Sequence, residues 1–270
     1  MVVAICLVIG LLAIRLAGKQ PPAPEPTECL VGPANEPVQL SVSQAQIAAT
    51  IAGVASHGGM PVRAVAIAYA TALQESKLAD LHYGDRDSVG IFQQRPSEGW
   101  GTPRQIEDPV YSTSRFFAAL AQVPHYLQMP ISAAAQAVQH SADGSAYGQY
   151  AAMGSELAKA FTGTLPHAVW CSYGTGVGKP RLAAARRALA SAFGPLTGRT
   201  AGDPAVGVDV RNARQGWAVA SWLICDAASY GITDVRYQGY EWLASTGSGH
   251  WLKEPALARS QAAPALVVFG

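Results

Sequence analysis

One carboxyl group stands out in the sequence because it ends a segment that is apolar on nearly every side. Segment 62–77 has a helical pattern that includes Val65 and Ile67. A helix that is apolar all round is buried, and Glu75 lies in its last turn. Loss of solvent and the partial negative charge at the helix C-terminus both favour the uncharged carboxylic acid. The pattern predicts Glu75 as a general acid. The alternative is a solvated Glu75–Lys77 pair at a frayed helix end.

The residues around Glu75 resemble those of known wall-cleaving enzymes. Glu75-Ser76 is followed by Gly90-Ile91-Phe92-Gln93-Gln94, which is similar to lytic transglycosylases and goose-type lysozymes, with Glu-Ser at a helix end and Gly-Leu-Met-Gln at the next turn. The runs 72–96, 99–103 and 134–141 look like an actinobacterial branch of that superfamily. The resemblance covers about residues 38–162.

The resemblance implies a role for each matching residue. Glu75 would protonate the leaving oxygen of a glycosidic bond and then take the proton of the sugar's own 6-hydroxyl, giving a 1,6-anhydro product without water. Ser76, Gln93 and Gln94 match positions that orient the acid and bind the glycan; the alternative for the two glutamines is a pair of solvated turn residues. The family's Ala-Tyr-Asn motif has no copy here. Its place is taken by 137–139 or by 146–148, which leaves Gln139 and Tyr147 as alternatives.

Two further carboxylates leave the reaction type open. Asp85 and Asp87 lie in 82–96, a long stretch without helical period, and long loops in compact domains are usually functional. If either faced Glu75 at the separation of an inverting pair, it would activate water and the enzyme would be a hydrolase. The alternative is that both aspartates simply form turns in a Gly-rich loop.

The surrounding pattern predicts an α+β protein in two parts. Its helices are expected near 41–57, 62–77, 108–120, 133–140 and 146–161, with a small hairpin within 82–96. This lysozyme-like, mainly α domain spans 38–172. A linker with a helix at 180–193 occupies 173–200. A small α/β module at 201–270 has a helix near 216–230 and strands near 233–237, 240–244, 250–252 and 265–269.

The N-terminal residues predict export. Residues 2–14 are an unbroken apolar run, shorter than the roughly 20 residues of a bilayer span but suited to a signal peptide. We interpret 1–19 as a signal anchor or signal peptide, the alternative being a buried core helix, and 20–37 as a Pro-rich linker. The protein is then extracytoplasmic, in the cell envelope, and membrane-anchored or secreted.

The cysteines agree with export. Cys29 and Cys171 bracket the segment that holds Glu75, so we expect a disulfide between them in an oxidising compartment. Cys225 lies in an apolar helical pattern and is expected to be buried. No Cys-x-x-Cys pair or His-Glu-x-x-His run occurs, so no metal and no cofactor is predicted.

The composition narrows the class of partner. A net charge of +1 gives no support for nucleic-acid binding, and an uncharged sugar polymer needs no strong field. The expected partner is the peptidoglycan glycan strand, whose β-1,4-glycosidic bond would be cleaved. A lysozyme-type hydrolase on the same fold and a noncatalytic wall-binding protein remain the alternatives. The aromatic residues of the C-terminal part are expected in its core rather than on a sugar platform.

Overall fold

The computed structural model describes residues 27–141, 144–174, 176–202, 205–245, 250–254 and 265–269. The chain has an α+β fold, mainly helical with a smaller β region, as the sequence predicts. The segment 1–19, interpreted as a leader, and residues 20–26 of the predicted Pro-rich linker lie outside the described residues, whereas Glu28–Val31 of that linker form a short strand. None of the helices in the described ranges combines the length and the apolar character needed to cross a bilayer.

The first half of the chain is helical. Its elements are α2 (Val42–His57), α3 (Val62–Glu75), η1 (Pro96–Glu98), α4 (Pro103–Ile106), α5 (Pro109–Leu120), α6 (Ile131–Gln139), η2 (Gly144–Tyr150) and α7 (Ala151–Phe161). The helix starts follow local chemistry. The Ser41 hydroxyl and the Gln44 side chain form a capping box at α2, and the Asp108 carboxylate accepts from the backbone N–H groups of Val110 and Tyr111 at α5.

Helix α3 is the buried centre of this half, as its composition predicts. Ten of its residues, Ala64 to Leu73, are buried. It packs closely on α7 because Gly154 faces it. A Cβ at that position would lie 2.8 Å from the carbonyl oxygen of Ala66 and 3.0 Å from the nitrogen of Ala70. The end of α3 is thereby held against the neighbouring helices.

Two antiparallel sheets complete the described fold. The smaller has the order β2-β1-β3 and contains β1 (Glu28–Val31), β2 (Val38–Leu40) and β3 (Val169–Ser172). The larger has the order β4-β5-β9-β6-β7-β8. Its strands are β4 (Gly198–Gly202), β5 (Ala205–Asp209), β6 (Asp234–Tyr237), β7 (Tyr240–Leu243), β8 (Leu252–Lys253) and β9 (Ala265–Phe269). Strands β1 to β5 are short elements that the sequence pattern did not indicate.

The expected disulfide is present. Cys29 and Cys171 are paired across β1 and β3 and joined through their Sγ atoms. The bridge spans a sequence separation of 142 residues, for which the chain-entropy model gives a stabilisation of about 4–5 kcal/mol. Cys225 is free and buried, as predicted. The bridge encloses all the helices from α2 to α7.

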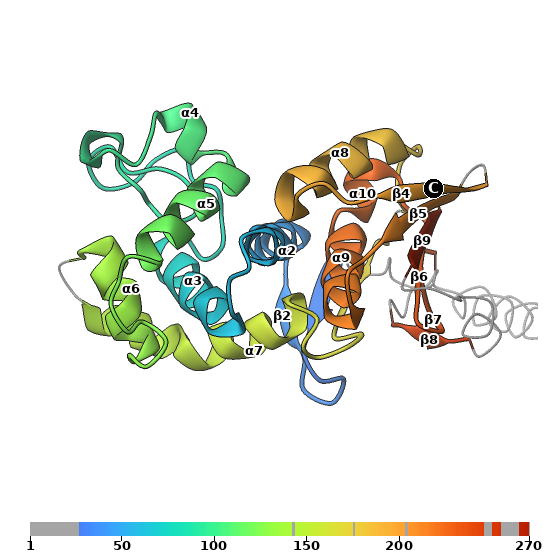
Figure 1. The fold of residues 1–270 in the computed structure, drawn as a ribbon, viewed down its shortest axis with the longest axis horizontal. Helices are drawn as coiled ribbons and strands as arrows, with labels where there is room; N and C mark the ends of the chain where they lie inside the picture. The colour runs from blue at the N-terminus through green and yellow to red at the C-terminus, as the bar shows by residue number, and fades with distance from the viewer. Residues whose placement is uncertain are drawn as a thin grey trace, which may run out of the picture.

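The second half packs on the first through α2. Helix α8 (Leu182–Phe193), which lies in the predicted linker, and α9 (Ala213–Cys225) both contact α2, and Figure 1 shows α2 between the α3 side and the α8–α9 side. A short helix, α10 (Ala227–Tyr230), follows α9. The indole N–H groups of Trp242 and Trp251 donate to the carbonyls of Cys171 and Val169 in β3. These contacts join the two parts in one packed core. The predicted domain boundaries at residues 172 and 201 therefore stay a prediction.

Local structure differs from the expected pattern at two places near Glu75. The hairpin expected within 82–96 is reduced to a single bridge between Val89 and Gln94, because Gly90 and Gln93 adopt positive φ and turn the chain immediately. The helix expected over 146–161 begins as the 3₁₀ segment η2 and continues as α7. The tighter winding of η2 changes the direction in which its side chains point.

Candidate functional site

The end of α3 opens onto a cavity of about 540 Å³. Glu75 borders it together with residues of the following loop and of the α6 end, among them Gln93, Arg95, Trp100 and Gln139. Trp100 also borders a neighbouring hollow of about 960 Å³ that runs between α5 and α6. The two hollows share Glu98, Trp100 and His140 and therefore adjoin each other.

Ser76 fixes the end of α3 from behind the cavity. Its side chain is buried, and its hydroxyl donates to the carbonyl oxygen of Ile91 at 2.8 Å and to that of Ala72 at 3.1 Å. The hydroxyl also accepts from the N–H of Ala79 at 3.2 Å. Ser76 therefore ties the helix end to the turn that follows and does not itself border the cavity.

Glu75 receives two hydrogen bonds on one oxygen. The hydroxyl of Tyr147, from η2, donates to Oε1 at 2.5 Å, and Nε2 of Gln139, the last residue of α6, lies 3.4 Å from the same atom. Gln139 is itself held by a 2.7 Å bond to the carbonyl oxygen of Phe92. The sequence left Tyr147 and Gln139 as alternatives, and the structure brings both to Glu75. Because both donors reach Oε1, a proton on the acid form would sit on Oε2.

Tyr147 is held in its neutral, donating form. Its side chain is fully buried. Burial first, and then the Glu75 carboxylate that it contacts, raise the pKa of Tyr147 well above its ordinary value, while a hydrogen bond with Ser141 opposes the shift. The hydroxyl is thus a permanent donor to Glu75.

Gln93 and Gln94 have different roles in the loop. The Gln93 side chain accepts from the Ser88 hydroxyl at 3.1 Å and donates to the carbonyl oxygen of Gly90 at 3.1 Å. Gly84 lies so close that a Cβ there would be 1.9 Å from Gln93 Oε1. Gln94 is only 2% exposed, and its Nε2 donates to the carbonyl oxygen of Ser112. Gln94 is therefore not a solvated turn residue, and both glutamines border the cavity.

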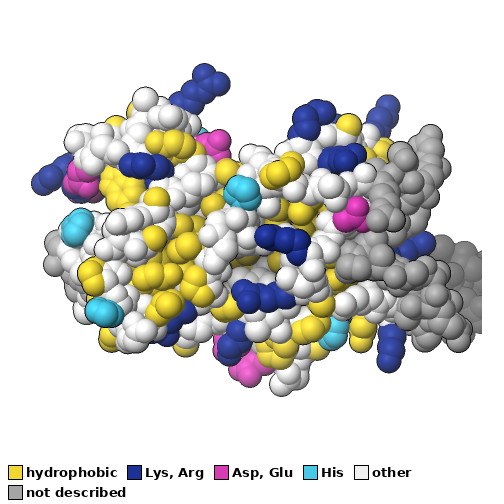
Figure 2. Space-filling model, viewed as in Figure 1, with side chains coloured by type: hydrophobic (Ala, Val, Ile, Leu, Met, Phe, Trp, Pro, Cys, Tyr) yellow, Lys and Arg dark blue, Asp and Glu magenta, His cyan; other side chains and the backbone are white. Residues whose placement is uncertain are grey.

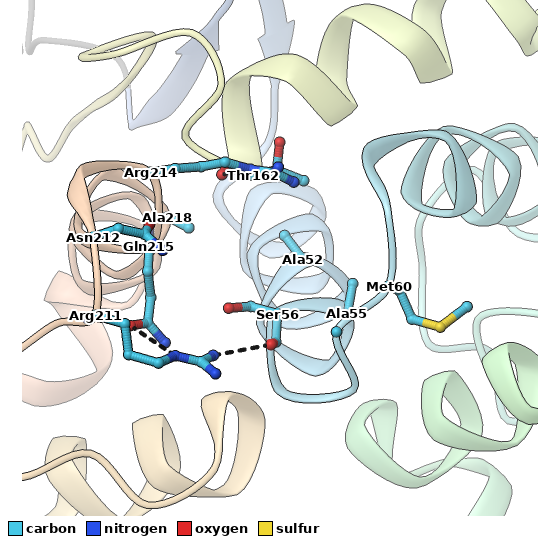
Figure 3. Close-up of a pocket in the computed structure, with 11 residues that line it drawn as sticks. Ala52, Ala55, Ser56, Met60, Thr162, Arg211, Asn212, Arg214, Gln215 and Ala218 are labelled. Atoms are coloured by element: carbon cyan, nitrogen blue, oxygen red, sulfur yellow. Dashed lines mark hydrogen bonds between the residues drawn. The ribbon is translucent and has the colours of Figure 1, made fainter.

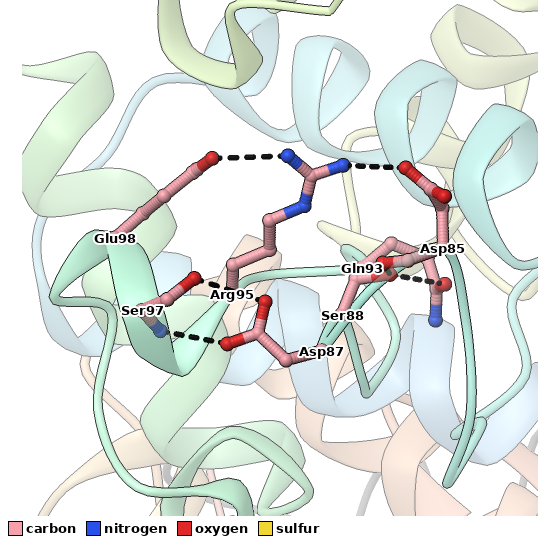
Figure 4. Close-up of polar contacts among 7 residues, drawn as sticks. All are labelled: Asp85, Asp87, Ser88, Gln93, Arg95, Ser97 and Glu98. Atoms are coloured by element: carbon pink, nitrogen blue, oxygen red, sulfur yellow. Dashed lines mark hydrogen bonds and ion pairs between the residues drawn. The ribbon is translucent and has the colours of Figure 1, made fainter.

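The other carboxylates of the loop are tied to partners (Figure 4). The Arg95 guanidinium contacts Asp85 at 2.8 Å and Glu98 at 3.1 Å. Asp87 accepts from the N–H of Ser97 at 2.8 Å and from its hydroxyl at 2.9 Å. These bonds, the backbone one first, lower the pKa of Asp87. Asp85 and Glu98 border the cavity, whereas Asp87 is not among the residues that line it.

Sequence reasoning missed three members of this site. Arg95 and Glu98 follow the turn, and Trp100 lies in a Gly-flanked run that signalled the family resemblance but not an individual role. These three residues border the cavity only because the loop that carries them folds back over it. A tryptophan in a Gly-rich segment was the one signal that would have identified Trp100, whose side chain is partly buried.

The described residues give no support for a metal centre. Within them, the only group of His, Cys, Asp or Glu at metal-binding spacing consists of Cys29, Cys171 and Cys225. Two of these thiols form the disulfide. The arrangement at Glu75 is instead suited to proton transfer by a single carboxyl group beside a polar cavity.

The comparisons with known proteins give no independent assignment. No protein-family model and no curated protein matches the chain.

Proposed function

We propose that this protein cleaves the β-1,4-glycosidic bond of peptidoglycan glycan strands, with Glu75 as the general acid and then the general base. The observation that carries the proposal is the state of the Glu75 carboxyl. Oε1 is held by Tyr147 and Gln139, while Oε2 has no hydrogen-bond partner among the described residues. A cavity-lining carboxyl group with one fixed and one free oxygen is suited to transfer a proton to a bound ligand.

The proposed reaction needs one carboxyl group and no water. The proton on Oε2 moves to the leaving glycosidic oxygen as the bond from that oxygen to the anomeric carbon breaks. The Glu75 carboxylate then takes the proton of the sugar's 6-hydroxyl, and the 6-oxygen bonds to the anomeric carbon. The product is a 1,6-anhydro sugar, and Glu75 is again protonated. Tyr147 and Gln139 stabilise the carboxylate between the two steps because both donate to it.

The surroundings of the other carboxylates favour this reaction over hydrolysis. An inverting hydrolase needs a second carboxylate free to activate water. Asp85 and Glu98 are paired with Arg95, and Asp87 accepts two hydrogen bonds from Ser97. The hydrogen bonds from Ser97 lower the pKa of Asp87, which makes it a weaker base than a free carboxylate. A noncatalytic glycan-binding role would not need the Tyr147–Glu75 contact at all.

The Cys29–Cys171 disulfide supports an extracytoplasmic location, which the substrate also requires. Disulfides persist in oxidising compartments and are rare in the cytosol. We therefore propose that the protein acts in the cell envelope, tethered to the membrane or secreted.

The test is digestion of purified peptidoglycan by the full chain, followed by mass analysis of the soluble fragments. We expect 1,6-anhydro fragments from the native protein and a loss of about a thousandfold in their rate of release from Glu75→Gln. The matched control is Glu156→Gln, at an exposed carboxyl that pairs with Lys159 and does not border the cavity. We expect the control to keep most of the activity.

Two outcomes would change the proposal. Fragments with ordinary reducing ends, lost in Glu75→Gln, would keep Glu75 as the acid and make the enzyme a hydrolase. Absence of any fragment from a folded native protein that still binds the glycan would replace cleavage by binding.

A further inference from the structure

A second hollow, lined by different residues from the Glu75 cavity, lies between α2 and the start of α9. It has a volume of about 270 Å³ and shares no lining residue with the Glu75 cavity. The volume falls just under the range of about 300–1,000 Å³ that is usual for drug-sized ligands. A molecule that fills this hollow is therefore small.

The α9 side of the hollow carries positive charge. Arg211 and Arg214 both line it, and none of the described residues that line it is acidic. Arg211 donates to the carbonyl oxygen of Ser56 on α2 at 3.2 Å, and Arg214 Nε donates to that of Thr162 at 3.3 Å. Figure 3 shows Arg211 and Arg214 at opposite ends of the hollow. Neither arginine has a carboxylate partner within the described ranges, so both guanidinium groups keep unused N–H donors.

A buried amide without a partner points to a ligand at this wall. Gln215 is only 5% exposed, and its Nε2 has no hydrogen-bond partner among the described residues. The orientation of the amide is fixed, because the backbone N–H of Arg211 donates to its Oε1 at 2.7 Å and Nε of Arg211 lies 3.4 Å from the same oxygen. A buried N–H donor that lacks an acceptor is costly, and an acceptor group of a ligand would remove that cost.

The opposite side of the hollow is apolar. Ala52 and Ala55 on α2 and Met60 line it, and Ala218 adds a methyl group on the α9 side. Figure 2 shows Lys and Arg side chains near the middle of this face, in the region where Figure 1 places α2 and α9, with hydrophobic side chains beside them. The hollow thus offers an anion-attracting end and a short aliphatic wall.

We propose that this hollow binds a small organic carboxylate, in which one carboxylate group is attached to a short aliphatic chain. The carboxylate accepts from a guanidinium group and from Gln215 Nε2, and the chain lies against the alanines of α2. Nε2 is shielded from solvent, so the exposed Arg211 side chain beside it shifts when the ligand enters. The proposal is independent of glycan cleavage, since the two sites have no residue in common.

The test measures binding of three probes to the full chain by calorimetry: N-acetylalanine, its neutral amide N-acetylalaninamide, and inorganic phosphate. We expect binding of the carboxylate, at least tenfold weaker binding of the amide, and phosphate weaker than the carboxylate because it cannot use the apolar wall. Equal binding of amide and carboxylate, or no carboxylate binding at concentrations on the order of 10 mM, would refute the proposal. If phosphate bound as tightly as N-acetylalanine, the proposed contact between the ligand's aliphatic chain and the apolar wall would be refuted.

Two variants locate the binding. Gln215→Glu is nearly isosteric and keeps the acceptor for Arg211, but it replaces the unpartnered donor by a negatively charged oxygen. We expect it to weaken N-acetylalanine binding at least tenfold, and Arg214→Gln to weaken it severalfold. The matched control is Gln128→Glu, at an exposed position outside the hollow, which should leave binding unchanged. Unchanged binding in Gln215→Glu, with the variant folded by its thermal transition, would overturn the assignment.

Discussion

Two buried helices of this protein each have a carboxyl residue at or directly after their last residue. Helix α3 ends at Glu75, and α9 ends at Cys225 with Asp226 as the next residue. Both helices are buried along most of their length. From the sequence pattern alone, Glu75 and Asp226 are equally expected to be desolvated carboxyl groups at the end of a buried helix.

The surroundings of the two groups are different. Glu75 borders a cavity and receives hydrogen bonds from Tyr147 and Gln139. Asp226 is 9% exposed and does not border that cavity, and burial raises its pKa to about 7. A displaced pKa therefore reports burial and is not by itself a sign of function. What distinguishes Glu75 is the access of a ligand and the donors that orient it.

The largest expected effect is the difference in activity between a variant of Glu75 and a variant of Asp226. In the peptidoglycan digestion, Glu75→Gln should lose about a thousandfold in rate because no proton can be supplied to the leaving group. Asp226→Asn should stay within about twofold of the native rate. A loss in Asp226→Asn as large as that in Glu75→Gln, with the fold intact by circular dichroism, would remove the distinction between the two helix ends.

The second expected effect is on stability, and it concerns how the free energy of unfolding changes with pH because of Asp226. The native Asp226 holds its proton up to about pH 7, whereas the unfolded chain releases it near pH 4. Between these values the native state binds more protons, so the free energy of unfolding falls as the pH rises, by at most about 4 kcal/mol from this group. Urea unfolding should give similar stabilities for native protein and Asp226→Asn at pH 4, and a more stable variant at pH 8. Asp234, whose pKa is also raised to about 7, mainly by burial, contributes equally to both proteins.

A smaller effect is expected when the hydrogen bond from Tyr147 to Glu75 is removed. Tyr147→Phe removes the 2.5 Å hydrogen bond to Oε1 and should lower kcat about ten- to a hundredfold, with a smaller change in KM, because Tyr147 orients the acid rather than binding the glycan. Tyr150→Phe is the matched control at the end of the same segment η2, where the hydroxyl contacts Lys77. An effect on KM alone would make Tyr147 a ligand-binding residue instead.

The smallest effect is expected at the loop carboxylates. Asp85→Asn and Asp87→Asn should each change the rate by less than about threefold, because an exposed ion pair with Arg95 and a pair of hydrogen bonds from Ser97 position the loop only weakly. The rate and the product mass are measured together. A loss of about a hundredfold or more in either variant, with reducing-end products, would identify a second catalytic carboxylate.

Much of the helical half could be predicted from local pattern. The apolar run of α3, the capping box at Ser41 and the Asp108 cap are short-range signals, and the structure has helices at these places. The short strands β2 and β4 pair only with their neighbours β1 and β5, and they were missed because each has five residues or fewer. Strands β1, β3 and β5 were missed because each also pairs with a strand far along the chain. Such pairing leaves little trace in a local sequence window.

The sequence by itself determined the position of Glu75 at the end of a buried helix, the burial of Cys225 and the pairing of Cys29 with Cys171. Each of these follows from residue type and spacing along the chain. Only the tertiary structure decided that Tyr147 and Gln139 both reach Glu75 and that Arg95 holds Asp85 and Glu98. It also decided that Nε2 of Gln215, between α2 and α9, has no hydrogen-bond partner among the described residues. These contacts join residues on different elements, so they depend on how the helices pack and not on the pattern of any one segment.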